Sequence, residues 1–252
     1  MSSMFIETIL GPAELPALAR RNLSGTACVV FDILRATSTF VTALQNGAHA
    51  IVPVAEIQAA VAWRGRQPDV LLAGERDGVR IRAELSGGID FDFGNSPREF
   101  RPERVRGKTI VSTTTNGTRA LRACAAAKTV LASSFLNLAA TAKYLNQLGP
   151  RELILICAGT GEGVAFEDVL AAGALAGLVD GTYSDATEVA ARTFLSAKAD
   201  LPAALASSQN ARRLLAIPEL RADVAFCAQR DVFKIVAAMN AEGALRVVGQ
   251  SK

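Results

Sequence analysis

Short apolar runs alternate with longer helix-like segments along most of this chain, and this alternation limits the choice of fold more than any other feature. The strand candidates are residues 27–34, 50–54, 69–73, 109–113, 129–132 and 153–157. The helix candidates are residues 37–46, 55–63, 118–127, 137–148 and 166–178. Strands that are apolar along their whole length are buried on both faces, as in parallel sheets covered by helices. We therefore predict an α/β fold with a mostly parallel sheet built from βαβ units, helices on both faces, and an active site at the carboxyl edge of the strands.

The length and composition suit one continuous domain that spans residues 1–252. Of the 252 residues, 50% are hydrophobic and 20% are charged, so the chain can bury a sizeable core. No tandem repeat or Pro/Gly/Ser-rich linker divides it, and two sub-lobes within the domain are an open alternative. Residues 74–106 interrupt the alternation with a long, polar, Gly-rich segment of a kind that often carries function. After residue 180 the pattern is mostly helical, with a final strand expected at residues 245–248.

Charge, hydropathy and cysteine usage exclude several classes of protein. A net charge of +3 and an aromatic content of 6% do not suit a nucleic-acid-binding surface, so we expect no nucleic-acid partner. The first residues lack the pattern of a signal peptide, and no apolar run is long enough to span a membrane. The four cysteines form no paired motif and are interpreted as buried, reduced side chains. We therefore expect a cytoplasmic protein with no membrane partner.

Acidic residues follow three of the predicted strands. Asp32 lies near the carboxyl end of the first strand, Glu75 follows the third, and the pair Glu167 and Asp168 follows the sixth, at the start of a helix. Each has a simpler interpretation, because Glu75 can pair with the adjacent Arg76 and acids are favoured at helix starts. Carboxylates that converge on one edge would repel one another without a cation, and oxygen ligands suit Mg²⁺ or a similar hard ion. The candidate metal ligands are Asp32, Glu75, Glu167 and Asp168.

Hydroxyl, amide and arginine side chains follow the same strands and predict an anion site. The run Thr113–Thr118 precedes a helix and offers hydroxyls and turn N–H groups, although an ordinary strand end with a helix cap would also use such residues. Arg35 suits bidentate contacts with phosphate or sulfonate. Residues 94–97 suit either a ligand loop or a helix start with Ser96 as N-cap. The candidate phosphate- and substrate-binding residues are Thr37, Ser38, Arg76, Asn95, Ser96, Thr113, Thr114, Thr115, Asn116, Gly117, Thr118 and Arg119.

The common phosphate and nucleotide signatures are absent or weak. Pro102 stands where a P-loop needs its first glycine, and Val164 stands at the last position of a dinucleotide fingerprint. The only histidine, His49, lies at a helix-to-strand junction, which argues against histidine phosphatases and Ser-His-Asp hydrolases. Asp90 and Asp92 resemble the DxD pair of aspartyl-phosphate phosphatases, but Asp90 does not follow a buried strand.

Several of these segments together resemble the 2-phosphosulfolactate phosphatase family. The matching motifs agree in order and spacing and cover most of the chain: residues 30–39, 74–76, 93–97, 113–119, 157–159 and 167–173. Residues 223–231 also resemble the end of the family pattern, but the proline expected after Val236 is missing.

The resemblance implies a Mg²⁺-dependent hydrolase that converts 2-phospho-3-sulfolactate and water to 3-sulfolactate and phosphate, a step toward coenzyme M. Its partner would be a small phosphorylated, sulfonated hydroxyacid, and a homo-oligomer is left open. Asp32, as nucleophile or base, and Arg35 would be the catalytic residues. Three alternatives remain at this point. The chain could be a phosphatase of another small phosphorylated hydroxyacid, a nucleotide- or anion-binding module built on residues 159–163 and the threonine loop, or an aspartyl-phosphate phosphatase using Asp90 and Asp92.

Overall fold

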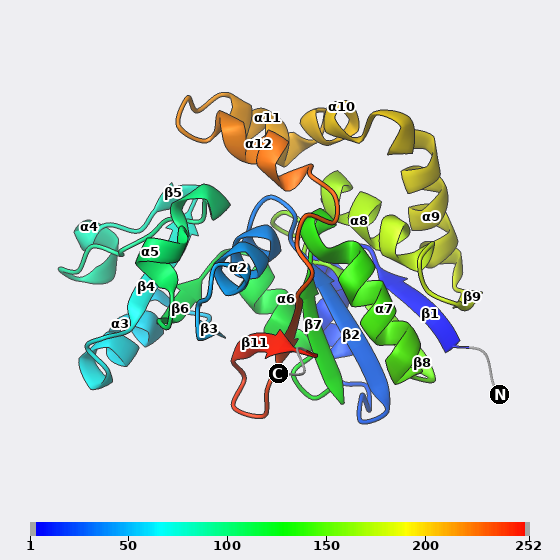
Figure 1. Ribbon diagram of the computed structural model, residues 1–252, viewed down its shortest axis with the longest axis horizontal. Helices are drawn as coiled ribbons and strands as arrows, with labels where there is room; N and C mark the ends of the chain where they lie inside the picture. Colours follow the sequence, from blue (N-terminus) through cyan, green and yellow to red (C-terminus); the bar gives the residue numbers. More distant parts are fainter. Residues whose placement is uncertain (1–3, 250–252) are drawn as a thin grey trace.

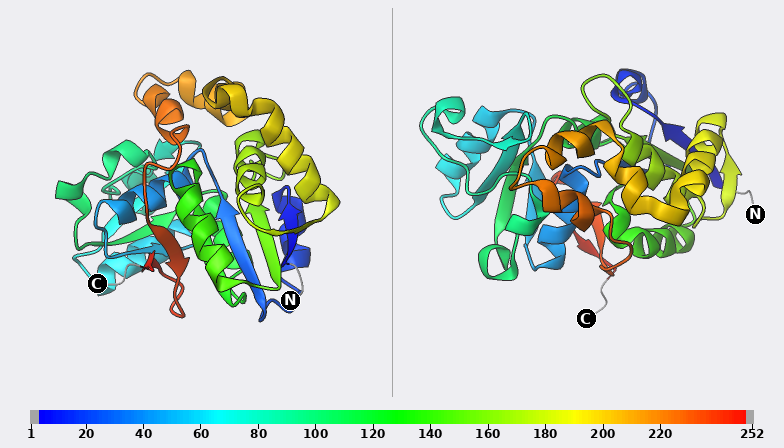
Figure 2. Two further views of the ribbon diagram at one scale, coloured as in Figure 1. Left: turned by 45° about the vertical axis from the view of Figure 1, so that its right-hand side comes forward. Right: turned by 90° about the horizontal axis from the view of Figure 1, so that it is seen from above.

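A single eleven-stranded sheet organises the computed structural model, which describes residues 4–249 (Figures 1 and 2). The strand order is β5-β4-β6-β3-β11-β10-β7-β2-β8-β1-β9. The strands are β1 (Met4–Ile9), β2 (Thr26–Phe31), β3 (Ala50–Pro53), β4 (Leu71–Arg76), β5 (Val79–Arg80), β6 (Thr109–Thr113), β7 (Thr129–Ser133), β8 (Glu152–Cys157), β9 (Gly181–Tyr183), β10 (Val236–Met239) and β11 (Leu245–Val248).

Helices connect most of the strands and form the covering layers. The α-helices are α1 (Leu15–Leu18), α2 (Ala36–Gln45), α3 (Ile57–Arg66), α4 (Ala83–Ser86), α5 (Pro102–Val105), α6 (Gly117–Ala123), α7 (Leu138–Leu148), α8 (Phe166–Ala176), α9 (Asp185–Ala197), α10 (Leu201–Ala206), α11 (Gln209–Leu215) and α12 (Arg221–Cys227). Short 3₁₀ turns are η1 (Pro12–Glu14), η2 (Pro97–Glu99), η3 (Phe135–Asn137) and η4 (Lys198–Asp200). Within residues 4–249, none of the helices has the length and apolar character that a membrane crossing requires.

The predicted α/β class is confirmed, with helices on both faces of a mostly parallel sheet. Alternate residues of β2 enter two separate cores, because successive side chains of a strand point to opposite faces. Val29 and Phe31 join a core that includes side chains of α7 and α8, whereas Cys28 and Val30 join a core with side chains of α2 and α6. A third, smaller core lies under α3 at the β4–β6 end of the sheet.

The sheet consists of two parallel groups that run in opposite directions, which the sequence pattern does not predict. Strands β4, β6 and β3 form one group, and β7, β2, β8, β1 and β9 form the other. The hairpin β10–β11 joins them through three successive antiparallel pairings, with β7, within the hairpin and with β3. The sequence analysis predicted only the second strand of this hairpin, because β10 is short and its pattern, VAAM, is not distinctive.

Sheet twist allows the two opposed groups to serve one site. Five strand-to-strand steps separate β2 from β6. At about 20 to 25° per step, the accumulated twist is roughly 100 to 125°. β2 and β6 belong to groups that run in opposite directions, but this rotation lets both strands direct their carboxyl ends toward the same side of the molecule. The residues that follow β2, β8, β4 and β6 accordingly line one pocket.

The first predicted strand ends three residues early, and side chains explain its end. The sequence pattern predicts a strand over residues 27–34, but β2 ends at Phe31. The N–H of Asp32 donates to the Thr37 hydroxyl at 3.0 Å, and the N–H of Ile33 donates to the Asp168 carboxylate at 2.8 Å. These side chains replace the ladder partners, so the chain leaves the sheet just before Asp32.

Replacement of Gly173 by alanine is predicted to destabilise the packing of α8 on α9. A Cβ at Gly173 would lie 2.0 Å from the carbonyl oxygen of Ala190, a backbone atom that cannot easily move away. We expect a loss of about 1 to 3 kcal/mol in the free energy of unfolding. Gly177, at the end of the same helix, has no contact closer than 3.8 Å and is the matched control. Gly177→Ala should leave the melting temperature unchanged or raise it slightly, and equal effects of both substitutions would contradict the prediction.

Candidate functional site

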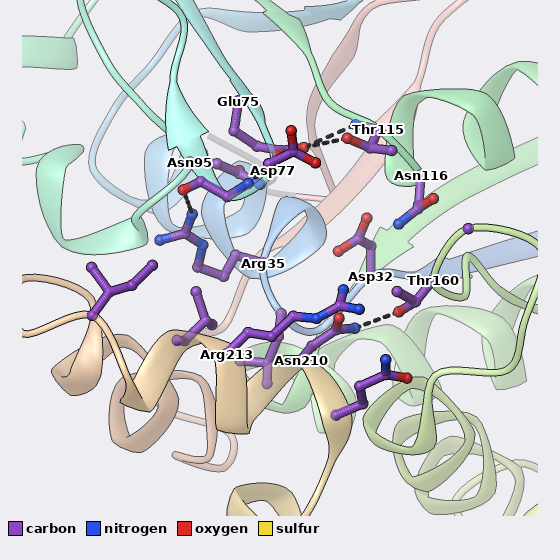
Figure 3. Close-up of a pocket in the computed structure, with 16 residues that line it drawn as sticks. Asp32, Arg35, Glu75, Asp77, Asn95, Thr115, Asn116, Thr160, Asn210 and Arg213 are labelled. Carbon is purple, nitrogen blue, oxygen red and sulfur yellow. Dashed lines mark hydrogen bonds between the residues drawn. The ribbon is translucent and has the colours of Figure 1, made fainter.

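A pocket of about 530 Å³ lies beyond the carboxyl ends of β2, β4, β6 and β8 (Figure 3). The β2 loop and η2 region supply Asp32, Leu34, Arg35 and Asn95, and the β4–β5 turn supplies Glu75, Asp77 and Gly78. The β6 and β8 loops supply Thr115, Asn116, Thr160 and Gly161. Gln209, Asn210, Arg213, Leu214 and Ile217 line the opposite side. Of the residues predicted from the sequence, the structure therefore brings together Asp32, Arg35, Glu75, Asn95, Thr115 and Asn116.

Asp32 is buried between the β2 loop and the start of α6. Its carboxylate accepts a hydrogen bond from the N–H of Ala36 at 3.0 Å, and the Thr37 hydroxyl donates to its carbonyl oxygen at 3.0 Å. A Cβ added to Gly117 would lie 2.7 Å from Asp32 Oδ2, so only glycine allows this close approach. Asp32 and the Thr113–Thr118 loop are thus in direct contact, as the phosphatase hypothesis requires.

The carboxylates around Asp32 are buried and repel one another. Burial raises the pKa of Asp32 to about 7, and the charges of Glu75 and Glu167 add to the shift. Burial also raises the pKa of Asp168 well above its usual value, with further contributions from Glu167 and Asp32. Glu167 Oε1 accepts from Asn210 at 2.7 Å, but Glu167 Oε2 is buried without a hydrogen-bond partner among the described residues. The hydrogen bonds within the protein therefore compensate the negative charge of this cluster only in part.

The donor set suits a hard cation that also binds water or substrate oxygens. Both oxygens of Asp168 accept backbone N–H groups, from Ile33 at 2.8 Å and Gly159 at 3.0 Å, so Asp168 fixes two loops. Among residues 4–249, no group of three or more His, Cys, Asp or Glu side chains could hold a metal ion on its own. Mg²⁺ is often bound by only one or two carboxylates, with water and phosphate oxygens as the remaining ligands. Asp32 and Glu167 have the chemistry for such a site.

The hydroxyl-rich loop after β6 binds a carboxylate of the protein itself. The N–H and the hydroxyl of Thr115 both donate to Glu75 Oε1, at 2.9 and 3.0 Å. The Thr114 hydroxyl accepts from the N–H of Thr118, and the Thr113 hydroxyl donates to the carbonyl oxygen of Ala55. Within the predicted phosphate cradle, Thr115 therefore binds Glu75, and Thr115 and Asn116 are the members that line the pocket.

The arginines predicted to bind anions all have partners within the protein. Arg35 donates to Asp223 and to the carbonyl oxygen of Gly78, each at 2.7 Å, and the ion pair is buried. Arg76 donates to the carbonyl oxygen of Glu75 and to the Thr113 hydroxyl, and does not line the pocket. Arg119 forms an exposed ion pair with Glu162 and also lies outside the lining.

The remaining predicted residues support the loops from outside the lining. The hydroxyls of Thr37 and Ser38 donate to the carbonyl oxygens of Asp32 and Ile33, and that of Thr118 donates to the carbonyl oxygen of Thr114. Ser96 precedes η2, as predicted, but its hydroxyl donates to Asp223 at 2.7 Å rather than to the turn.

The acidic pair Asp90 and Asp92 also lies outside the pocket lining. Asp90 accepts from the N–H of Ala83, and Asp92 bonds Arg64 and the N–H of Leu72. Both carboxylates hold the segment between β5 and β6 in place, so the structure gives no support to the aspartyl-phosphate alternative.

The sequence analysis missed the whole side of the pocket that α11 contributes. The side-chain amide of Asn210 donates to the Thr160 hydroxyl at 2.6 Å and to Glu167 at 2.7 Å, and Arg213 lies one turn later on the helix. The rule that places ligands at strand ends cannot find residues on a helix that packs across the sheet edge from elsewhere in the chain. A polar pair spaced i, i+3 on a helix is too common to serve as a signal on its own.

Comparisons with known proteins agree on one family. The sequence model of the family described as 2-phosphosulpholactate phosphatase matches residues 14–242. A protein of Thermotoga petrophila named probable 2-phosphosulfolactate phosphatase is 40% identical over 209 residues, which are 82% of this chain and 86% of the relative. Proteins with the same name from Gloeobacter violaceus and Synechococcus sp. (strain JA-3-3Ab) are 35% and 34% identical, over 86% and 94% of this chain and 89% and 95% of their own lengths.

Asp32→Asn is predicted to stabilise the metal-free protein at neutral pH. The pKa of Asp32 is about 7 in the folded protein and close to 4 in the unfolded chain, so the folded state binds the extra proton between these values. The contribution of Asp32 to the free energy of unfolding therefore falls as pH rises from about 4 to 7, and it is constant above about pH 7. The stability advantage of the asparagine variant should grow by about 2 kcal/mol between pH 5 and pH 8. Thermal unfolding with a chelator measures it, and a pH-independent difference would contradict it.

Asp223→Ala is predicted to destabilise the protein because it leaves a buried guanidinium without its counter-ion. Loss of one partner of a buried ion pair costs about 3 to 5 kcal/mol. Arg98→Ala is the matched control, since Arg98 is half-exposed and 3.8 Å from the same carboxylate. That substitution should change the free energy of unfolding by less than about 1 kcal/mol. Equal denaturation midpoints for Asp223→Ala and the unsubstituted protein would show that the pair does not hold the loops.

Proposed function

Because the chain belongs to the 2-phosphosulpholactate phosphatase family, we propose that it hydrolyses 2-phospho-3-sulfolactate to 3-sulfolactate and phosphate, a step toward coenzyme M. The observation that carries this proposal is the position of Asp32. Its buried carboxylate stands at the meeting point of three loops, in contact with Gly117 and at the wall of a pocket large enough for a small phosphate ester. The four free, buried cysteines are consistent with a reducing cytoplasmic setting.

We propose Mg²⁺ as the cofactor, held by Asp32 and Glu167. Glu167 Oε2 has no hydrogen-bond partner in the described structure, and a cation would offset the burial and the smaller repulsion that raise the pKa of Asp32. Glu75, which also lines the pocket and whose oxygens accept three hydrogen bonds, adds negative charge and fixes Thr115. When bound, Mg²⁺ supplies charge neutralisation and polarisation at a phosphate oxygen.

The protein residues orient the ester and keep the reacting carboxylate in place. Asp32 acts in its ionised form, either on phosphorus or on an attacking water, and the N–H of Ala36 fixes its orientation. The amide side chains of Asn95 and Asn116 line the pocket and can donate to phosphoryl oxygens as charge shifts toward the leaving oxygen. The Arg35–Asp223 pair orients the loop that carries Asp32 instead of contributing a free charge.

Phosphate release from a panel of phosphorylated hydroxyacids tests the proposed function. The protein should hydrolyse 2-phospho-3-sulfolactate in the presence of Mg²⁺, and EDTA should abolish the activity. Asp32→Asn should lower kcat/KM by at least about 10³-fold, because a group in direct contact with the reaction is lost. Asp90→Asn is the matched control, since Asp90 lies outside the pocket lining, and should retain activity.

Three outcomes would contradict the proposal. Faster hydrolysis of another phosphorylated hydroxyacid would assign a different substrate. Tight binding of the ester without turnover would indicate a binding module. Loss of activity in Asp90→Asn but not in Asp32→Asn would favour the aspartyl-phosphate alternative.

A further inference from the structure

Helix α11 presents one arginine to the pocket, from the side opposite the strand ends. Figure 3 shows Arg213 extending from this helix into the pocket, on the same side as Asn210 and facing the region of Asp32. Figures 1 and 2 show that α10, α11 and α12 pass over the sheet as one continuous segment. The pocket therefore has a floor of strand-end loops and a roof made by α11.

Arg213 is the unpaired cation of this pocket. Three acids line it, Asp32, Glu75 and Asp77, against two arginines. The charge of Arg35 is compensated by the buried carboxylate of Asp223. Among the described residues, Arg213 forms no salt bridge, although it lies beside an acidic floor. The acidic lining would repel a substrate with several negative charges unless a cation compensated them. Among the described residues of the lining, Arg213 is the cation without an acidic partner.

The protein fixes the position of this arginine through the helix that carries it. Asn210, one turn earlier on the same face, is bonded to Thr160 and Glu167 on the floor. Ser208 caps the helix by accepting from the N–H of Ala211, and Leu214 packs in a small core with Val224. Because α11 is held on both sides of Arg213, the backbone position of this exposed residue is fixed, and only its side-chain torsions have to be ordered when a ligand binds.

We propose that Arg213 binds the acid group of the substrate that is not transferred, the sulfonate or carboxylate, and thereby selects phosphate esters that carry a second anion. This inference rests on the proposed function. The phosphoryl group has to lie on the floor beside Asp32, so the rest of the molecule points toward the roof. A guanidinium there can form two parallel N–H···O bonds with a carboxylate or a sulfonate. The arginines considered from the sequence for this contact, Arg76 and Arg119, do not line the pocket.

Three substrates that differ only in their acid groups test this proposal. They are 2-phospho-3-sulfolactate, 2-phospholactate and isopropyl phosphate, and the last has no second anion. With full-length protein and Mg²⁺, Arg213→Ala should lower kcat/KM for 2-phospho-3-sulfolactate by about 10- to 100-fold, mainly through KM. A similar loss for 2-phospholactate would identify the carboxylate as the bound group, and a loss confined to 2-phospho-3-sulfolactate would identify the sulfonate. Isopropyl phosphate should change by less than about 3-fold, and Arg213→Lys should recover part of the loss. Arg212→Ala is the matched control: this neighbouring arginine lies outside the pocket lining and should behave as the unsubstituted protein.

Two kinetic outcomes would overturn the role of Arg213. An equal loss for all three esters would place it at the phosphoryl group or in the fold, and no loss for any would remove it from substrate binding. Calorimetric binding of 3-sulfolactate separates this inference from the proposed function. If the unsubstituted protein hydrolyses no ester but binds 3-sulfolactate in a manner that Arg213→Ala abolishes and Arg212→Ala does not, the anion site stands and the phosphatase proposal fails. Binding that both variants retain would reject the anion site.

Discussion

The mutual repulsion of four buried carboxylates is the constraint on which the structure of the pocket depends. Asp32, Glu75, Glu167 and Asp168 are each at least nine-tenths buried. A buried charge is tolerated only where donors or a counter-ion compensate it. Backbone N–H groups from four loops point at these carboxylates: Ala36 at Asp32, Gly78 and Thr115 at Glu75, and Ile33 and Gly159 at Asp168. The acids thus determine the loop conformations. Among residues 4–249, Glu167 Oε2 is a buried carboxylate oxygen of this group without a hydrogen-bond partner, which makes it a candidate ligand for the proposed cation.

The sequence could predict the floor of the pocket because the floor follows a local rule. Apolar strands were recognisable one by one, and β6 and β11 have the predicted bounds. Polar residues near the ends of the predicted strands, such as Asp32, Asn116 and Glu75, were then expected at the carboxyl edge of the sheet. The direction of each group of strands and the position of α11 depend on pairings between distant segments, and no local pattern encodes them. β1 was also missed, because Glu7 and Thr8 interrupt its apolar run.

The loop from Thr113 to Thr118 shows that a pattern of anion donors can bind a carboxylate of the protein as well as a predicted ligand. Closely spaced N–H and hydroxyl donors favour an anion, and the sequence analysis assigned them a phosphate. The structure supplies Glu75 from the neighbouring strand β4 instead. Donor spacing alone cannot distinguish a side-chain carboxylate from a ligand, because both present oxygens with negative charge. Which one binds depends on the strand that happens to lie alongside, and that is a tertiary property.

The roof segment links the two oppositely directed halves of the sheet as well as covering the pocket. Asp223 of α12 bonds Ser96, in the segment between β4 and β6, and also Arg35, in the loop after β2. Asn210 of α11 bonds Thr160 and Glu167, beyond β8. The β10–β11 hairpin joins the halves through the sheet, but its pairing with β3 is a single residue pair, Leu245 with Ile51. A single pair does not fix the angle between two half-sheets on its own. Side chains of both halves, such as Ile51 and Val30, share one hydrophobic core, and the polar contacts of α11 and α12 add to this connection. Pocket geometry and roof position are therefore coupled, because displacement of the roof would break hydrogen bonds to the loops on both sides of Asp32.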